Sequence, residues 1–285
     1  MSKVLVISGT HGNETNAVQD VYDLKLKYEE QNIHDIIFCQ AWNIAALNAG
    51  TREFVKHSNE LPDDMNRAFP TAEPMDKEKS ISALKDLIDW TDIVIDVHNS
   101  EFLKNCVVIN NDCRARHYVD FCKENKIPFI VIESTTNTIK RFALNEDKVG
   151  FTVEIGDMNF SDSNAGVDFL DKLIKALQTT DLETLRNPNE VPLDASQVVK
   201  TVYAHSQGLL RIFKDDEHSE KPKRSEILRH YLKGERIFII ENPVKLAYRS
   251  EEVIAPCNGY VMDLVDSYWV DDGDVILSFQ PDLED

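Results

Sequence analysis

Short apolar runs alternate with longer amphipathic stretches from the N-terminus to about residue 180. The first run is Val4-Leu5-Val6-Ile7, and strands are expected at residues 3–8, 35–40, 93–97, 106–109, 128–132 and 151–155. Apolar residues recur at every third or fourth position in between, which predicts helices at residues 15–30, 76–90, 113–126 and 163–178. This alternation predicts an α/β fold with a mixed, mostly parallel sheet and helices on both of its faces.

The pattern changes near residue 190. Asn187-Pro188-Asn189 and Pro192 interrupt the chain, and short alternating strands without helical periodicity follow them. Two pairs in this part, Asn258-Gly259 and Asp272-Gly273, suit tight β-hairpin turns. We therefore predict a catalytic domain at residues 1–190 and a small β-rich C-terminal domain, a barrel or sandwich, at residues 191–285.

Composition narrows the classes of partner. The 285 residues include 31 Lys and Arg against 50 Asp and Glu, a formal net charge of -19, which argues against nucleic acids and anionic membranes. No apolar run approaches the ~18 residues of a membrane span, and no basic region precedes an apolar N-terminal stretch. We expect a cytoplasmic protein with reduced cysteines, and a homo-oligomer is compatible with the sequence.

Candidate metal ligands stand where two expected strands end. His11 and Glu14 follow the strand at residues 3–8, and His98 follows the strand at residues 93–97. Zinc accepts imidazole nitrogen and carboxylate oxygen together, and a catalytic site keeps three protein ligands with one position open. In open α/β sheets, ligands bind outside the carboxyl ends of the strands. The pattern favours one zinc ion per chain, although His11 alone could equally cap the following helix.

Four further polar residues suit hydrolysis of an amide. Zinc polarises a carbonyl and lowers the pKa of a bound water, and a carboxylate such as Glu154 then moves the proton to the leaving amine. Arg52 suits stabilisation of the oxyanion, and Arg67 with Asn66 suits a substrate carboxylate. Each has a simpler interpretation: the arginines could balance nearby surface acids, and Glu154 could cap a turn.

Four motifs in register carry a family resemblance. They are Gly9-Thr10-His11-Gly12-Asn13-Glu14, Asp64-Met65-Asn66-Arg67-Ala68-Phe69, Asp96-Val97-His98-Asn99 and Val153-Glu154-Ile155-Gly156. In this order and spacing the chain resembles the aspartoacylase and succinylglutamate desuccinylase family. The resemblance implies the fold of the zinc carboxypeptidases, with a small C-terminal β-domain that caps the site.

The resemblance also implies roles for single residues. Zinc ligands would be His11, Glu14 and His98, and Glu154 would act as general base and then as general acid. Arg52 looks like the arginine that polarises the scissile carbonyl, while Asn66 and Arg67 look like the pair that holds the substrate carboxylate. Tyr248 is similar to a tyrosine that reaches the site from the C-terminal domain. Arg141 is the nearest counterpart of a further substrate-binding arginine, although its spacing to Glu154 departs from the family pattern.

These observations predict a zinc-dependent amidohydrolase that removes the acyl group from a small anionic N-acyl amino acid. A carboxypeptidase acting on short peptides would use the same metal site, and a non-catalytic binding protein could retain the fold. The C-terminal segment also resembles biotinyl and lipoyl carrier domains. However, Asp266-Ser267 stand where a carrier domain needs a lysine at its hairpin tip.

Overall fold

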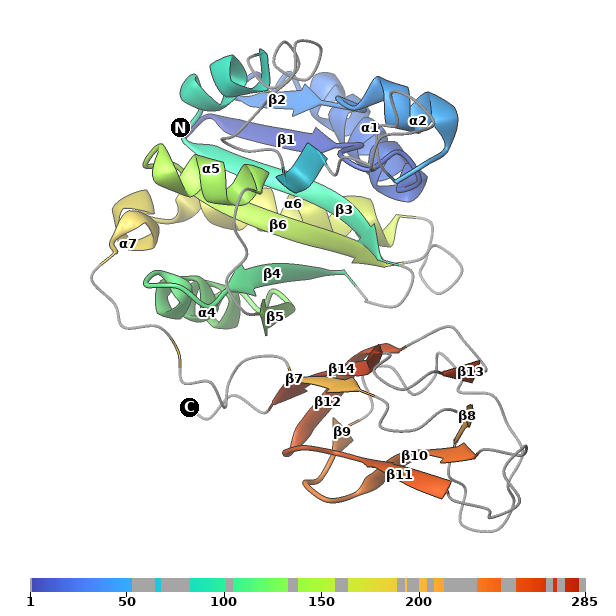
Figure 1. Cartoon of the computed structure of the whole chain (residues 1–285). Helices are drawn as coiled ribbons and strands as arrows, with labels where there is room; N and C mark the ends of the chain where they lie inside the picture. Colours follow the sequence, from blue (N-terminus) through green and yellow to red (C-terminus); the bar gives the residue numbers. More distant parts are fainter. Residues whose placement is uncertain are drawn as a thin grey trace. The chain divides into compact units, whose positions relative to one another are not determined.

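The computed structural model describes residues 2–52, 65–67, 83–100, 105–132, 138–156, 164–188, 193, 200–203, 208–212, 230–241, 250–264, 269–270 and 275–281. The chain forms two compact units, one made of residues 1–129 and 134–192 and the other of residues 130–133 and 193–285 (Figure 1). The domain boundary expected at residue 190 stays a prediction. Among the described residues, no helix combines the length and apolarity that crossing a membrane requires.

The described residues between 4 and 156 form a six-stranded mixed sheet, in the order β2-β1-β3-β6-β4-β5. Its strands are β1 (Val4–Ser8), β2 (Ile36–Cys39), β3 (Ile93–Ser100), β4 (Cys106–Asn110), β5 (Phe129–Ile132) and β6 (Val149–Gly156). β1 pairs in parallel with β2 and β3, and β3 pairs in parallel with β6, whereas β4 runs antiparallel to β6. The mostly parallel α/β sheet expected from the sequence is confirmed.

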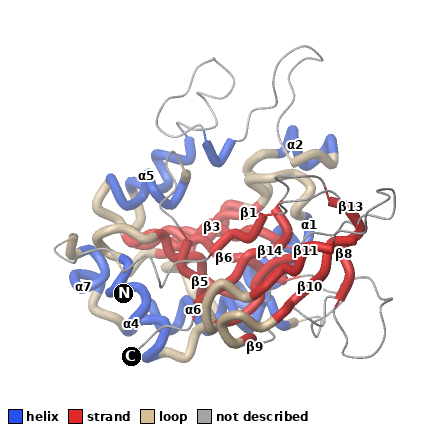
Figure 2. Tube along the Cα trace, turned by 60° about the horizontal axis from the view of Figure 1, so that its bottom comes forward, coloured by secondary structure: helices blue, strands red, loops and turns tan. Residues whose placement is uncertain are grey.

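Helices cover both faces of this sheet (Figure 2). They are α1 (Thr15–Glu30), α2 (Ile44–Ala49), a helix at residues 83–89, α4 (Ala115–Glu124), α5 (Ile139–Asn145), α6 (Ala165–Thr179) and α7 (Leu182–Arg186). On one face, Leu5 and Val94 join a buried cluster with Ile88 of the helix at residues 83–89 and Phe142 of α5. On the opposite face, where β6 presents Phe151, the rings of α4 pack closely, with 4.8 Å between the Tyr118 and Phe151 centroids.

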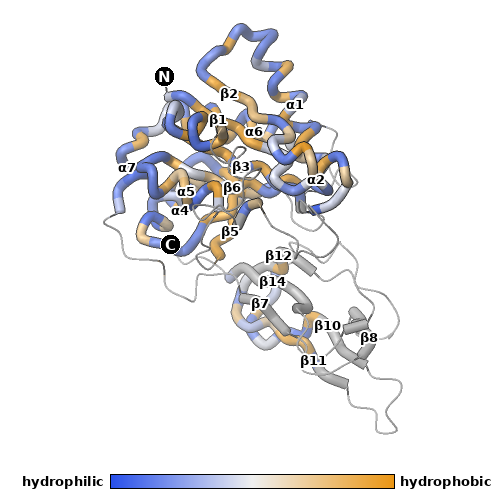
Figure 3. The backbone as a smooth tube through the Cα atoms, turned by 45° about the horizontal axis from the view of Figure 1, so that its top comes forward, coloured by the Kyte–Doolittle hydropathy of each residue, from blue (hydrophilic) through white to orange (hydrophobic). Residues whose placement is uncertain are grey.

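The central strands are apolar on both faces because both are covered. β1 is buried along its whole length, and Figure 3 colours much of β1, β3 and β6 as hydrophobic. Burying such strands stabilises the fold by about 25 cal/mol for each Å² of apolar surface removed from water. A parallel strand buried on both faces loses the simple alternation of polar and apolar residues.

Three short helices, α2, α5 and α7, were not expected from periodicity. Each has seven residues or fewer, which is too short for a repeat of 3.6 residues to stand out. Their ends do carry capping residues: Asn43 accepts a bond from the Ala46 N–H at the start of α2, and Gly50 ends it at a φ of +63°. The helix expected at residues 76–90 is seen at residues 83–89, and its beginning lies outside the described residues.

The described residues of the second unit form two four-stranded sheets, in the orders β11-β10-β8-β13 and β7-β14-β12-β9. The strands are β7 (Lys200–Tyr203), β8 (Gly208–Ile212), β9 (His230–Tyr231), β10 (Arg236–Glu241), β11 (Ser250–Ile254), β12 (Gly259–Leu264), β13 (Trp269–Val270) and β14 (Val275–Pro281). This confirms the β-rich C-terminal part. The prediction of a hairpin at Asn258-Gly259 is wrong, because β11 and β12 belong to different sheets and each pairs with other strands.

A close contact between α1 and α6 buries a carboxyl group. Gly166 of α6 approaches Asp20 of α1 so closely that a Cβ atom added to the glycine would lie 1.9 Å from Asp20 Oδ2. Asp20 is only 3% exposed. Burial, together with the nearby Asp23 carboxylate, raises the pKa of Asp20 to about 6.

We expect Asp20→Asn to stabilise the protein at neutral pH. The carboxyl of an unfolded chain ionises near pH 3.8, so between about pH 4 and pH 6 the folded state binds more protons than the unfolded state. The free energy of unfolding therefore falls as the pH rises through this window, and the full cost, about 3 kcal/mol at most, remains above pH 6. Denaturant unfolding at pH 4 and pH 7.5 should show a gain for the variant only at the higher pH.

Asp120→Asn provides the control, since Asp120 is an exposed aspartate on the helix α4. A gain of equal size in both variants, or at both pH values for Asp20→Asn, would contradict the assignment of the cost to the buried carboxylate.

Candidate metal centre

Glycines shape the loop between β1 and α1, which carries His11 and Glu14. Gly9 adopts a φ of +72°, a left-handed conformation that glycine reaches without steric cost. A Cβ atom on Gly12 would lie 2.0 Å from the carbonyl carbon of Ala46 in α2. The Gly12 N–H also donates to the backbone oxygen of Arg52 at 3.3 Å. The loop can therefore lie against α2 and the residues that follow it only with glycine at this position.

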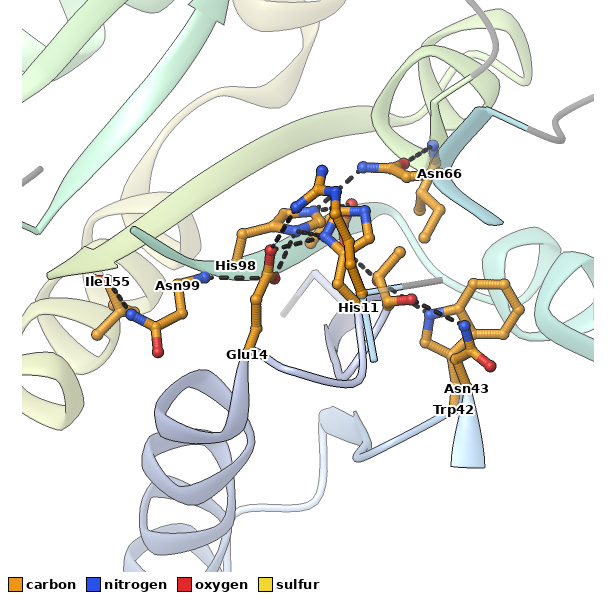
Figure 4. Close-up of polar contacts among 12 residues, drawn as sticks. His11, Glu14, Trp42, Asn43, Asn66, His98, Asn99 and Ile155 are labelled. Atoms are coloured by element: carbon orange, nitrogen blue, oxygen red, sulfur yellow. Dashed lines mark hydrogen bonds and ion pairs between the residues drawn. The ribbon is translucent and has the colours of Figure 1, made fainter. Parts of the chain in front are cut away.

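Three side chains meet at the edge of the sheet where its parallel strands have their carboxyl ends. His98 lies on β3, next to the end of β1, and its ligand atom lies within 4.8 Å of those of His11 and Glu14, all three residues being buried (Figure 4). His11 Nδ1 is 2.7 Å from Glu14 Oε1, and His98 Nδ1 is 2.9 Å from Glu14 Oε2. The two Nδ1 atoms are 3.2 Å apart.

The donor and acceptor pattern of this group fits a cation. His98 Nε2 is 2.8 Å from Asp96 Oδ2, and a carboxylate there can only accept, so Nε2 carries the proton and Nδ1 keeps its lone pair. That lone pair faces the Glu14 carboxylate and His11 Nδ1. Repulsion among these acceptors is relieved only by a proton or a cation between them. Tetrahedral zinc at about 2.0–2.2 Å from each ligand places them about 3.3–3.6 Å apart. The separations seen are shorter, at 2.7–3.2 Å.

The charges around the three side chains also favour a cation. Burial alone would raise the pKa of Glu14, but hydrogen bonds that His11 and His98 donate in their protonated forms lower it to about 2, so its carboxylate stays ionised without a metal. Burial would lower the pKa of His98, but Asp96 and Glu14 outweigh it and hold the value well above the ordinary range. Two carboxylates therefore stabilise positive charge at this point, either a proton on His98 or a bound metal ion that replaces it.

Glu154 lies beside His98 on β6. The two residues are partners in the parallel register of β3 and β6, so their side chains leave the sheet on the same face. Burial raises the pKa of Glu154 to about 7; His98 opposes the change, and the Glu14 and Asp96 carboxylates add to it. A carboxyl group that ionises near neutral pH is suited both to accept and to return a proton.

Arg52 and Asn66 also lie at this edge. Arg52 Nη1 donates to Glu14 Oε1 at 3.2 Å, and its side chain is about half exposed, at 49%. Asn66, in the short 3-10 helix η1 (Met65–Arg67), places its amide nitrogen 3.2 Å from His98 Nε2 and accepts the Ile139 N–H at 3.0 Å. Arg67 follows in the same helix, and its side chain lies outside the described residues.

One residue expected at the site is placed elsewhere. Arg141 of α5 forms an ion pair with Asp112, at 3.0 Å between Nη1 and Oδ2. Cys106, at the start of β4, pairs with Glu154. Asp112 follows the other end of β4 and therefore lies at the end of the sheet away from His98 and Glu154. Tyr248 lies outside the described residues.

Several residues around the ligands were missed by the sequence reasoning. Asp96 shares a face of β3 with His98, and an Asp two positions before a ligand in an apolar strand is a signal that could have found it. Asn99 donates its backbone N–H to Glu14 Oε2 at 3.4 Å. Thr10 and Trp42 hydrogen bond to each other behind Asp96, and no sequence pattern links these two positions.

Solved structures similar to this one share the fold across nearly the whole chain. A succinylglutamate desuccinylase/aspartoacylase from Rhodobacter sphaeroides superposes with a TM-score of 0.70 at 17% identity, covering 100% of this chain and 86% of that one. The product-bound ectoine utilization protein EutE (DoeB) from Ruegeria pomeroyi gives 0.68 at 16% identity, covering 99% and 86%. An aspartoacylase family protein from Mesorhizobium loti gives 0.67 at 17% identity, with the same coverage. At these identities the likeness establishes the fold alone.

The sequence itself identifies the family. No curated protein sequence matches the chain. The model of the succinylglutamate desuccinylase/aspartoacylase catalytic domain, however, matches residues 1–183, which include His11, Glu14, His98 and Glu154. Since this match spans well over half of the 285 residues, the chain belongs to the succinylglutamate desuccinylase/aspartoacylase family.

Proposed function

We propose that this protein is a zinc-dependent amidohydrolase that releases a carboxylic acid and a free amino acid from an N-acyl amino acid. Family membership supports hydrolysis of the desuccinylase or aspartoacylase type. The observation that carries the proposal is the buried His11, Glu14 and His98 group, with Glu154 beside it on the next strand.

The ligand set and Glu154 divide the chemistry between them. Zinc held by the three ligands would polarise the scissile carbonyl and lower the pKa of water. Glu154 takes the proton of the attacking water on a carboxylate oxygen and delivers it to the amide nitrogen, so that the C–N bond breaks as the amine leaves. Its raised pKa, about 7, suits both transfers. Arg52, half exposed beside Glu14, stabilises the negative charge that develops on the carbonyl oxygen.

The substrate we propose is a small anion. A chain with a net charge of -19 repels anions on average, so binding one requires a local positive region. Arg52 and Arg67, together with the metal, would supply that region, and an arginine can hold a carboxylate through two parallel hydrogen bonds. Asn66 adds a neutral donor next to Arg67. Arg141 is held by Asp112 and is left out of this proposal.

We propose that the C-terminal domain expected at residues 191–285 restricts the substrate to small molecules by capping the site, with Tyr248 contributing from that domain. A carboxypeptidase acting on short peptides and a binding protein without turnover remain the alternatives, and the experiments below separate them.

We expect purified protein to contain about one zinc ion per chain. His98→Ala should lose nearly all of this metal, because His11 and Glu14 alone provide only two of the three protein ligands. His34→Ala, at an exposed histidine, is the matched control and should keep it. Elemental analysis measures the metal, and hydrolysis should disappear on chelation and return with added zinc. A metal-free protein that added zinc does not activate would contradict the site.

We expect Glu154→Gln to lower kcat by about 10²- to 10⁴-fold, since the amide cannot shuttle a proton, while zinc content stays at the wild-type level. Steady-state kinetics with elemental analysis of the same samples provide the measurement. Glu124→Gln, at an exposed position of α4, should leave both unchanged. If Glu154→Gln keeps most of its turnover, another residue is the base.

We expect N-acetyl-aspartate and N-succinyl-glutamate to be hydrolysed with kcat/KM at least about 100-fold higher than dipeptides of similar size. A dipeptide carries a positively charged α-ammonium group, which the proposed positive region of metal, Arg52 and Arg67 repels, whereas these two substrates carry only negative charge. Comparing these compounds under identical conditions gives the measurement. A preference for dipeptides would identify a peptidase. Tight binding of the acyl amino acids without any hydrolysis would identify a binding protein.

A further inference from the structure

We propose that Trp42 and Thr10 are positioning residues for His98 and act on it through Asp96. This inference rests on the proposed metal site and extends it to two residues that do not contact the ligand atoms. The hydrogen bonds run in sequence from Trp42 Nε1 to Thr10 Oγ1 at 2.9 Å and from Thr10 Oγ1 to Asp96 Oδ1 at 2.9 Å. Asp96 Oδ2 then meets His98 Nε2 at 2.8 Å.

The chemistry of each group fixes the direction of this series. An indole N–H can only donate, so the hydroxyl oxygen of Thr10 accepts from Trp42 and turns its own proton toward Asp96. The Asp96 carboxylate can only accept, so its second oxygen takes the proton carried by His98 Nε2. Nδ1 of His98 is thereby left with the lone pair that a metal requires.

Asn66 competes with Asp96 for His98 Nε2. Its amide oxygen accepts the Ile139 N–H, which orients the amide nitrogen toward His98 Nε2 at 3.2 Å. An amide N–H favours an unprotonated Nε2, and that tautomer would place the proton on Nδ1, where the metal binds. The bond that His98 Nε2 donates to Asp96 is shorter and has a charged acceptor, so it prevails while Asp96 keeps its orientation. Thr10 and Trp42 maintain that orientation.

The surroundings make the series rigid and dry. Thr10 and Asp96 are both 0% exposed, so water cannot take the place of the threonine hydroxyl. The loop that carries Trp42 is held to the end of β1 by Trp42 N–H to Ser8 O and Asn43 N–H to Gly9 O, each 3.3 Å. The Asn43 side chain adds a bond to the Thr10 carbonyl at 3.0 Å. Trp42 and Thr10 are therefore fixed relative to each other by backbone as well as side-chain bonds.

Zinc affinity of the folded protein tests the inference. Loss of the direct hydrogen-bond partner of a metal-binding histidine typically weakens metal binding by about 10- to 100-fold. Thr10→Val keeps the shape, removes the hydroxyl and leaves that partner, Asp96, in place, so we expect a loss near the lower end of this range, about 10-fold. Thr10→Ser restores the hydroxyl and should bind zinc within about threefold of wild type. Trp42→Phe removes the N–H and should bind more weakly than wild type but less weakly than Thr10→Val. Competition of the metal-free proteins against a chromogenic chelator measures these constants.

A double variant separates positioning from packing. If Trp42 acts through Thr10, then Trp42→Phe adds no further loss in the Thr10→Val background, whereas an independent packing role gives additive losses. Trp90→Phe, at a tryptophan that is 57% exposed, is the control for the change of ring and should bind zinc as wild type does. Thermal unfolding of the metal-free variants, followed in parallel, reports stability apart from affinity.

Each outcome bears on one assignment. Wild-type protein that binds no zinc overturns the metal site and with it the proposed function. Wild-type protein that binds zinc, with Thr10→Val and Trp42→Phe equally tight, overturns the positioning role alone. If Thr10→Val does not fold, Trp42→Phe measured against Trp90→Phe decides the matter, and equal affinities reject the inference.

Discussion

The in-register parallel pairing of β1, β3 and β6 is the constraint on which the site depends. Parallel strands end at the same edge, so residues far apart in sequence meet there without any loop having to reach across the sheet. His98 and Glu154 are register partners, and the loop after β1 brings His11 and Glu14 beside them. A slip of one residue between β3 and β6 would turn one of these side chains to the opposite face. The core that fixes the register therefore also fixes the chemistry.

Two buried carboxylates, those of Glu14 and Asp96, concentrate the attraction for a cation at one point in the site. Glu14 stays ionised although it is buried, and Asp96 is hydrogen bonded to His98. Because little water reaches either group, each depends on a positive partner. The same two carboxylates add to the rise in the pKa of Glu154 that burial causes, which joins the tuning of the proposed base to the geometry of the proposed ligands. Under the proposed mechanism, removing either acid alters both metal binding and proton transfer.

The sequence predicts those parts of the site that stand at the ends of long apolar strands, because strand position alone decides where such residues go. This holds for the placement of His11, Glu14, His98 and Glu154 at one edge. It fails where short helices or side-chain partners decide: α5 was unexpected, and Arg141 on it is drawn to Asp112 at the other edge. Pairings between distant loops, such as that of Trp42 with Thr10, leave no periodic trace in the sequence.

The antiparallel direction of β4 has a consequence for remodelling this protein. Because β4 enters the sheet beside Glu154 and leaves it at the far edge, its two flanks are not equivalent. Asn105, which accepts the Gly156 N–H at 2.9 Å, stands on the flank that shares an edge with the proposed metal ligands. A fluorophore attached there would stand near the site, whereas one on Asn111 would be separated from it by the length of β4. Loop grafts meant to change selectivity belong on the same flank.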